Sequence, residues 1–169
     1  MALYYFDTSA LVKYYVAEPG SAWVRQVIDA LDPAGGQSPH IILVAEITRV
    51  EVAAGLAAIE RAGRIRRAER ERAYHRFTSQ LTQRYAIASL VTDDLATAAQ
   101  LTQRHPLKAY DAVQLAVALR SQRTLSVRQH TLTFVSGDTP LITAAQAEEL
   151  PTDNPFAHVS PTDAPGPSV

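Results

Sequence analysis

The stretch ALYYFDTSALVKYYV, residues 2–16, decides how this chain folds. Its first five residues form a short apolar run that predicts a buried strand, and Asp7 ends that run. The residues that follow carry apolar side chains at helical spacing, and Pro19 and Gly20 stop the helix that this spacing predicts. A buried strand that leads directly into a helix is typical of an α/β domain.

The same alternation continues along the chain. Short apolar runs predict strands at residues 41–44, 86–91 and 132–135. Apolar residues three or four apart predict helices at residues 20–31, 45–62, 64–85, 94–104, 109–122 and 140–150, with Gly63 separating two of them. Residues 32–40, DPAGGQSPH, predict a turn-rich loop. Strands that alternate with helices indicate a mostly parallel central sheet.

Length and composition restrict the class of protein. A chain of 169 residues fits one domain, which we assign to residues 1–150, followed by a Pro-rich tail at 151–169 that we expect to be extended or disordered. The absence of cysteine excludes disulfides and thiolate metal sites. No apolar run reaches the roughly 18 residues that a membrane span needs, so we expect a cytoplasmic protein. A net charge of −1 means that any nucleic-acid binding must use a local patch.

Four acidic residues lie where folding alone does not explain them: Asp7, Glu51, Asp111 and Asp138. Each follows or interrupts an apolar stretch, and a buried ionised carboxylate needs a partner. Two of them follow predicted strands, and ligands of open parallel sheets bind at the carboxyl ends of the strands. Four carboxylates suit a hard divalent cation such as Mg²⁺ or Mn²⁺. The sequence therefore predicts a metal site.

Helix capping is the alternative explanation for several of these acids. Asp7 and Asp138 both precede helices, where Asp is a favoured N-cap, and Asp111 in a first turn complements the helix dipole. Capping and metal ligation can coexist. Glu51 has uncharged neighbours along its helix, which favours a ligand over a solvated residue. For Glu46, Asp93 and Asp94 we favour capping or dipole interactions and keep them as reserve ligands.

The chain resembles the PIN-domain ribonucleases of the VapC type, which are toxins of bacterial toxin–antitoxin pairs. The resemblance covers most of residues 3–150 in the family's order, through four stretches: YFDTSALVKYYVAEPGS, ITRVEVAAGL, HPLKAYDAVQLAVAL and TFVSGDTPLITAAQAEEL. It implies a three-layer α/β/α fold and a metal-dependent endoribonuclease that cuts single-stranded or loop RNA. It also implies a small antitoxin partner and a homodimer.

The resemblance carries roles onto individual residues. Asp7, Glu51, Asp111 and Asp138 match the acids that hold Mg²⁺ or Mn²⁺ in the family, and Ser9 matches a residue that supports the first acid. Gln114 stands where many relatives have His, and we expect that this departure does not touch an acid.

Basic and aromatic residues leave further alternatives open. Lys13 is a candidate phosphate contact or else a solvated lysine. Residues 60–84 carry eight Arg against three Glu, which fits RNA binding, but a solvated helix with pairs such as Glu60–Arg64 and Arg67–Glu71 is favoured. The same segment carries an apolar stripe made of Tyr74, Phe77, Leu81 and Tyr85. Core packing is the favoured use of this stripe, and an exposed dimer contact is the alternative.

Three rival functions remain. A non-catalytic PIN-like RNA-binding or scaffold protein would not need all four acids, and a DNA nuclease of the same fold would keep them. A haloacid-dehalogenase-type phosphatase needs a second Asp two residues after the first, where this chain has Ser9.

Overall fold

A computed structural model describes residues 2–31 and 39–163 of the chain. The predicted loop at 32–40 therefore lies almost entirely outside the described residues. The elements in chain order are β1 Ala2–Phe6, α1 Thr8–Tyr15, α2 Ser21–Ile28, β2 His40–Ala45, α3 Thr48–Arg61, α4 Arg67–Arg84, β3 Ala86–Ala88, α5 Thr92–Arg104, α6 Ala109–Ser126, β4 Leu132–Val135, α7 Thr139–Ala147, β5 Thr152–Asp153 and the 3₁₀ helix η1 Pro155–His158.

The sheet is parallel, and its strands follow the order β3-β2-β1-β4-β5. The chain builds one half outward from β1 through β2 and β3, and then returns to the other side of β1 with β4. Strand order therefore reverses between β1 and β4, which is where open α/β sheets bind their ligands. The mostly parallel sheet predicted from the sequence is confirmed.

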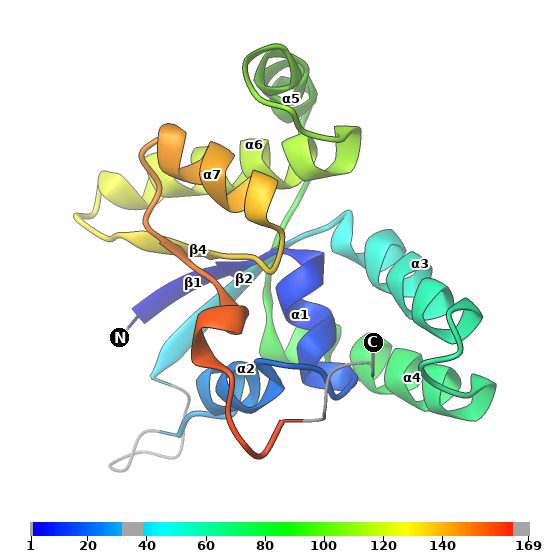
Figure 1. The fold of residues 1–169 in the computed structure, drawn as a ribbon. Coiled ribbons are helices and arrows are strands. Elements are labelled where there is room, and N and C mark those ends of the chain that lie inside the picture. The colour runs from blue at the N-terminus through cyan, green and yellow to red at the C-terminus, as the bar shows by residue number, and fades with distance from the viewer. Residues whose placement is uncertain (1, 32–38, 164–169) are drawn as a thin grey trace.

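Helices cover both faces of the sheet, with α5, α6 and α7 on one side and α1 and α2 on the other (Figure 1). The sheet has a hydrophobic core on each face. Neighbouring residues of β1 belong to different cores, because successive side chains of a strand point to opposite faces. Tyr5 packs in the core under α6 and α7, whereas Phe6 packs with the residues of α1 to α4. Both rings are fully buried. This is the expected three-layer α/β/α architecture.

The boundary between α3 and α4 falls where the sequence predicts it. Gly63 has a φ of +72°, a left-handed conformation that glycine adopts at little cost, and it lies just after the end of α3. Phe77 and Leu81 of α4 and Tyr85 at its C-cap are buried in the core that α4 shares with α1, while Tyr74 is exposed. Three residues of the stripe therefore belong to the core, and a dimer contact through the exposed Tyr74 stays a prediction.

Residues 151–163 of the tail, which we call the C-terminal strap, pack against the domain through one short extended strand and a 3₁₀ helix, and residues 164–169 lie outside the described residues. β5 pairs with β4 in parallel, and Asp163 accepts hydrogen bonds from the backbone N–H groups of Gly20 and Ala22 at 2.9 and 2.7 Å. The rings of Trp23 and His158 stack with their centroids 4.4 Å apart. The strap is held by contacts to residues far away in sequence, so its Pro-rich composition alone could not reveal them.

Candidate functional site

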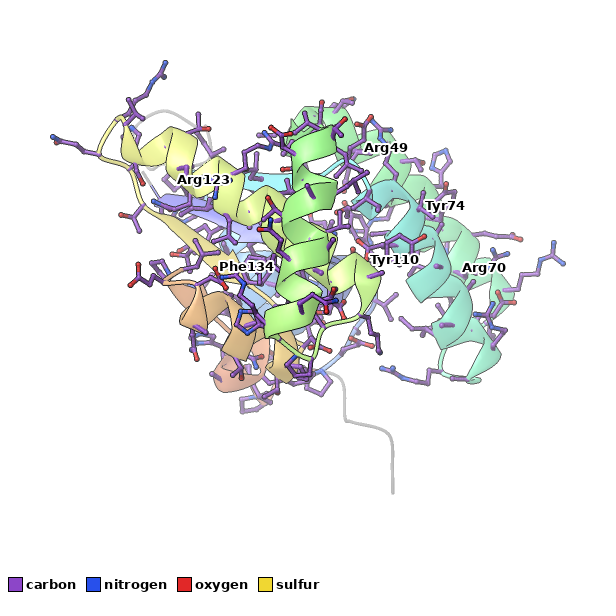
Figure 2. All side chains as sticks on the ribbon, turned by 90° about the horizontal axis from the view of Figure 1, so that it is seen from above. Arg49, Arg70, Tyr74, Tyr110, Arg123 and Phe134 are labelled. Carbon is purple, nitrogen blue, oxygen red and sulfur yellow. The ribbon has the colours of Figure 1, made fainter. Side chains whose placement is uncertain are left out.

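The four predicted acids line a single cavity of about 780 Å³. Each comes from the start of a different helix, and together they lie at the carboxyl ends of β1 and β4. Figure 2 labels Tyr110 in the first turn of α6, and this residue precedes Asp111 and also lines the cavity. Residues 7, 51, 111 and 138 are thus brought together by the fold.

Asp7 is buried at the N-cap of α1. Its carboxylate accepts hydrogen bonds from the Ala10 N–H at 2.9 Å, from the Ser9 hydroxyl at 2.8 Å and from the Ser136 hydroxyl at 3.1 Å. Burial raises the pKa of Asp7 to about 7, the three hydrogen bonds oppose that rise, and the charge of Glu51 adds to it. Asp7 therefore caps α1 and also lines the cavity. The hydroxyl of Ser9 donates a hydrogen bond to its carboxylate, which agrees with the supporting role that the resemblance implies.

Glu51 is oriented by two polar side chains from other elements. It accepts hydrogen bonds from the Thr8 hydroxyl at 2.9 Å and from the amide of Gln114. The carbonyl oxygen of that same amide accepts a hydrogen bond from the Tyr5 hydroxyl at 2.6 Å. Burial raises the pKa of Glu51, the hydrogen bonds from Gln114 and Thr8 lower it, and the charge of Asp111 raises it. The expectation that Gln114 does not touch an acid is therefore wrong.

Asp111 and Asp138 complete the row of acids. Asp138 is the N-cap of α7 and accepts a hydrogen bond from the Leu141 N–H at 2.9 Å. Asp111 lies in the first turn of α6, where burial is the main cause of its raised pKa and the charge of Asp138 is the next. The negative charge of one acid thus raises the pKa of the next: Glu51 acts on Asp7, Asp111 on Glu51, and Asp138 on Asp111.

No counter-charge in the described part of the chain neutralises these acids by direct contact. Within residues 2–31 and 39–163, none of the four forms an ion pair with Lys, Arg or His. Three of them nevertheless carry pKa values raised by burial. Partly buried oxygen donors that lack a cation match the ligand preference of Mg²⁺ or Mn²⁺.

The carboxylates do not form a ready-made metal site. Among the described residues, no three acidic or histidine side chains are close enough together to hold an ion. Binding of a cation would require the acids to draw closer, which their mutual repulsion opposes until the cation is present. The donor set suits a hard cation, but the spacing of the carboxylates among the described residues does not by itself make a metal site.

Lys13 is buried at the side of the cavity, so it is not a solvated lysine. Its ammonium forms an ion pair with Glu18 at 3.2 Å and lies 3.9 Å from the centre of the Phe156 ring. Glu18 also pairs with Arg64. A substrate phosphate would have to compete with Glu18 for this ammonium.

The reserve ligands lie elsewhere. Asp94 accepts a hydrogen bond from the Val91 N–H at 3.0 Å and pairs with Arg120 at 2.8 Å, so the capping interpretation is confirmed for it. Glu46 and Asp93 are exposed and do not line the cavity. No histidine of the described residues lines the cavity either.

Sequence reasoning missed Thr8, Ser136 and Phe156 as members of the site. Thr8 and Ser136 each lie within two residues of a predicted acid, Asp7 and Asp138 respectively, so closeness to the acids was a usable signal. Phe156 had no such signal, because only the path of the C-terminal strap brings it to the cavity.

Comparisons with known proteins agree with this fold. The structure is similar to the crystal structure of PAE2754 from Pyrobaculum aerophilum, with a TM-score of 0.60, 17% identity and coverage of 93% of this chain and 92% of that one. It is also similar to FitAcB from Neisseria gonorrhoeae, with a TM-score of 0.57, 18% identity and coverage of 90% and 98%. A toxin–antitoxin complex from Klebsiella pneumoniae aligns with a TM-score of 0.47, 21% identity and coverage of 82% and 88%.

Comparison with curated proteins gave no match. No helix of the described residues is long and apolar enough to cross a membrane. The PIN domain family model matches residues 4–146, a span that holds all four acids of the cavity, the strands β2, β3 and β4, and the greater part of β1. On that match over most of its length, the chain belongs to the PIN domain family.

Proposed function

We propose that this protein is a metal-dependent endoribonuclease. The observation that carries the proposal is the row of four acids that lines one cavity at the switch point of a PIN-domain sheet, none of which forms an ion pair with a Lys, Arg or His among the described residues. Members of this family are usually nucleases. Hydrolysis of a phosphodiester develops negative charge on the phosphate, and a site made of carboxylates can stabilise that charge only with a cation.

Asp7, Glu51, Asp111 and Asp138 would hold one or two Mg²⁺ or Mn²⁺ ions. A bound ion of this kind supplies Lewis acidity and lowers the pKa of a coordinated water. The chain's own groups set the positions of the ligands. Ser9 and Ser136 orient the Asp7 carboxylate, and Thr8 and Gln114 orient that of Glu51. The raised pKa of Asp7 means that a cation would compete with a proton for this carboxylate near neutral pH.

RNA is the proposed substrate, because the motifs around the acids resemble those of ribonucleases that cut single-stranded or loop RNA. Attack of a water on the phosphorus, in line with the leaving oxygen, would leave a 3′-hydroxyl and a 5′-phosphate. A non-catalytic RNA-binding protein would not need four converging acids, so the cavity counts against it. The family match leaves the phosphatase hypothesis without support.

We further propose that the protein is the toxin of a toxin–antitoxin pair, acts in the cytoplasm and forms a homodimer. These proposals rest on the resemblance to VapC-type toxins. Sedimentation at micromolar concentration should show a dimer, and the product of a small neighbouring gene should suppress cleavage. A monomer without such a suppressor would remove the toxin proposal while leaving the nuclease proposal intact.

The nuclease proposal is tested with purified protein and labelled RNA and DNA of the same sequence. Cleavage of RNA in Mg²⁺ or Mn²⁺ but not in EDTA is expected. Cleavage of DNA alone would identify a DNA nuclease, and the absence of cleavage of any RNA offered, including total cellular RNA, would favour the non-catalytic alternative.

A further inference from the structure

The C-terminal strap holds an aromatic ring at the edge of the acidic cavity. Phe156 lies in η1 and lines the cavity together with the four acids. Its side chain is nevertheless 49% exposed. The ring is therefore accessible to a ligand that enters the cavity beside the four acids.

The position of the ring is fixed by the anchors of the strap. Ahead of it β5 is hydrogen-bonded to β4, and behind it His158 stacks on Trp23. Further along, the Asp163 carboxylate binds two backbone N–H groups at the start of α2. A ring held from both sides loses little conformational entropy when a ligand binds to it.

The ring contacts only part of its surroundings in the site. The ammonium of Lys13 lies over one face, 3.9 Å from the ring centre. Near the ring edge stands Gly137, where a Cβ atom would approach a Phe156 ring carbon to 3.2 Å. Glycine at this position therefore permits the close approach of the ring to the loop that carries Asp138. Phe156 remains 49% exposed beside these contacts and is one of the residues that line the cavity.

We propose that Phe156 is a stacking platform for a nucleobase of the strand that is cut. This inference rests on the proposed nuclease function and adds a base-binding position to it. A nucleic acid strand brings a flat aromatic base with every phosphate, and an exposed aromatic ring binds such a base without regard to its identity. Bases within a duplex are already stacked on one another, so the platform favours unpaired nucleotides.

The test measures binding of a short fluorescein-labelled RNA, too short to pair with itself, in EDTA so that it stays intact. Phe156→Ala and Phe156→Leu should weaken binding about tenfold or more, since both remove the aromatic face. Phe156→Trp should bind as well as wild type. Val159→Ala is the matched control, because Val159 is an exposed apolar residue of the same strap that does not line the cavity.

A second measurement separates stacking from a structural role in covering Lys13. In a series of RNAs that each lack one base, wild type should lose affinity most at one position, and Phe156→Ala should lose nothing further there. If Phe156→Ala weakens every RNA in the series equally, the ring only supports Lys13 and the inference is wrong.

Other outcomes are equally decisive. If wild type cuts RNA but Phe156→Ala and Phe156→Leu bind it as wild type does, stacking is wrong while the nuclease proposal stands; a ring that receives a side chain of a protein partner would give this result. If wild type neither binds nor cuts RNA, the proposed function fails and the inference fails with it. Thermal melts show whether each variant is folded. If Phe156→Ala does not fold, Phe156→Leu provides the test.

Discussion

Asp7 performs two tasks at the scale of a single residue. Its carboxylate caps α1 through the Ala10 N–H, and the same carboxylate faces the cavity. An Asn side chain caps a helix about as well as Asp does, but it lacks the charge that a metal ligand needs. Substitution by Asn therefore separates the structural task from the proposed catalytic one.

We predict that Asp7→Asn, Asp111→Asn and Asp138→Asn each remain folded and lose RNA cleavage by about a hundredfold or more, since the charge they supply acts on the transition state. Cleavage rates and thermal melts check this prediction. Asp93→Asn is the control, because Asp93 is an exposed Asp in the first turn of α5 and does not line the cavity. Near wild-type cleavage by all three cavity variants would make the acids structural and refute the nuclease proposal.

Gln114 shows how a buried amide can act through a neighbouring acid. It links the hydroxyl of Tyr5 to the carboxylate of Glu51, and its side chain is almost fully buried. Gln114→Leu keeps the volume but leaves both partners without this hydrogen bond. Because unsatisfied buried polar groups cost about 1–3 kcal/mol each, we predict a lower free energy of unfolding by that order.

The same variant should cleave RNA more slowly, since Glu51 loses the group that orients it. Urea denaturation and cleavage rates measure the two effects. Gln103→Leu, an exposed Gln of the neighbouring helix α5, should change neither. Unchanged stability and cleavage in Gln114→Leu would mean that Glu51 is held by Thr8 alone.

At the scale of elements, α3 and α4 show that helical spacing predicts an ion pair only when both residues lie on the same helix. The pair Arg67–Glu71 was predicted from its spacing of four and is observed at 2.8 Å. The pair Glu60–Arg64 was predicted in the same way and is wrong, because Glu60 pairs with Arg70 and Arg64 pairs with Glu18. The turn at Gly63 breaks the helix between Glu60 and Arg64, so their helical spacing does not apply.

Two exposed arginines of α4 are candidate contacts for the proposed RNA substrate, although Arg76 also lies over the rings of Tyr14 and Tyr15. Arg72 and Arg76 line a second cavity of about 440 Å³, which Arg64 shares with the acidic one, and neither forms an ion pair with the described acids. We predict that Arg72→Gln and Arg76→Gln weaken RNA binding and lower the slope of log affinity against log salt by about 0.7 each.

Binding titrations at several salt concentrations provide the measurement. The control is Arg67→Gln, because Arg67 already pairs with Glu71 on the exposed side of α4. A slope that is unchanged in Arg72→Gln and Arg76→Gln would support the solvated-helix interpretation of this segment.

At the scale of the whole molecule, the acids make stability depend on pH. Burial raises the pKa of Asp7 from 3.8 to about 7 and also raises the pKa values of Glu51 and Asp111. A carboxyl whose pKa is higher in the folded than in the unfolded state favours folding while it is protonated. Its contribution is complete below the unfolded pKa and is lost as pH rises through the folded pKa, here between about pH 4 and 7.

We predict that, in EDTA, Asp7→Asn becomes more stable relative to wild type as pH rises from about 4 to 7, by an amount on the order of 4 kcal/mol for Asp7 alone. Urea denaturation at a series of pH values measures this difference. Asp93→Asn, which is outside the cavity, should keep the pH dependence of wild type. Curves for Asp7→Asn and wild type that run parallel would contradict the raised pKa.

Binding of Mg²⁺ should restore the stability that the wild type loses as pH rises. At 100 times its dissociation constant, Mg²⁺ bound only to the folded state adds about 2.7 kcal/mol. Wild type at neutral pH should therefore gain more stability from Mg²⁺ than Asp111→Asn does, while Asp111→Asn should melt higher in EDTA. A lower melting temperature of the metal-free variant together with an unchanged response to Mg²⁺ would place Asp111 in a structural network instead.

The sequence by itself determined the order of the elements as far as α7, the parallel sheet and the four acids. Each of these depends on local information: apolar periodicity, the turn at Gly63, and a carboxylate that interrupts an apolar run such as the one before Asp7. The carboxyl ends of parallel strands meet at one edge, so topology alone predicted that Asp7 and Asp138 lie near each other.

Only the tertiary structure decided how those acids are held and what lies beside them. The amide of Gln114 reaches Glu51, the hydroxyl of Ser136 reaches Asp7, and the ring of Phe156 covers Lys13. These contacts join residues that are far apart in the chain. They depend on the register of β1 with β4 and on the return of the strap along β4, and no local periodicity in a single sequence records either one.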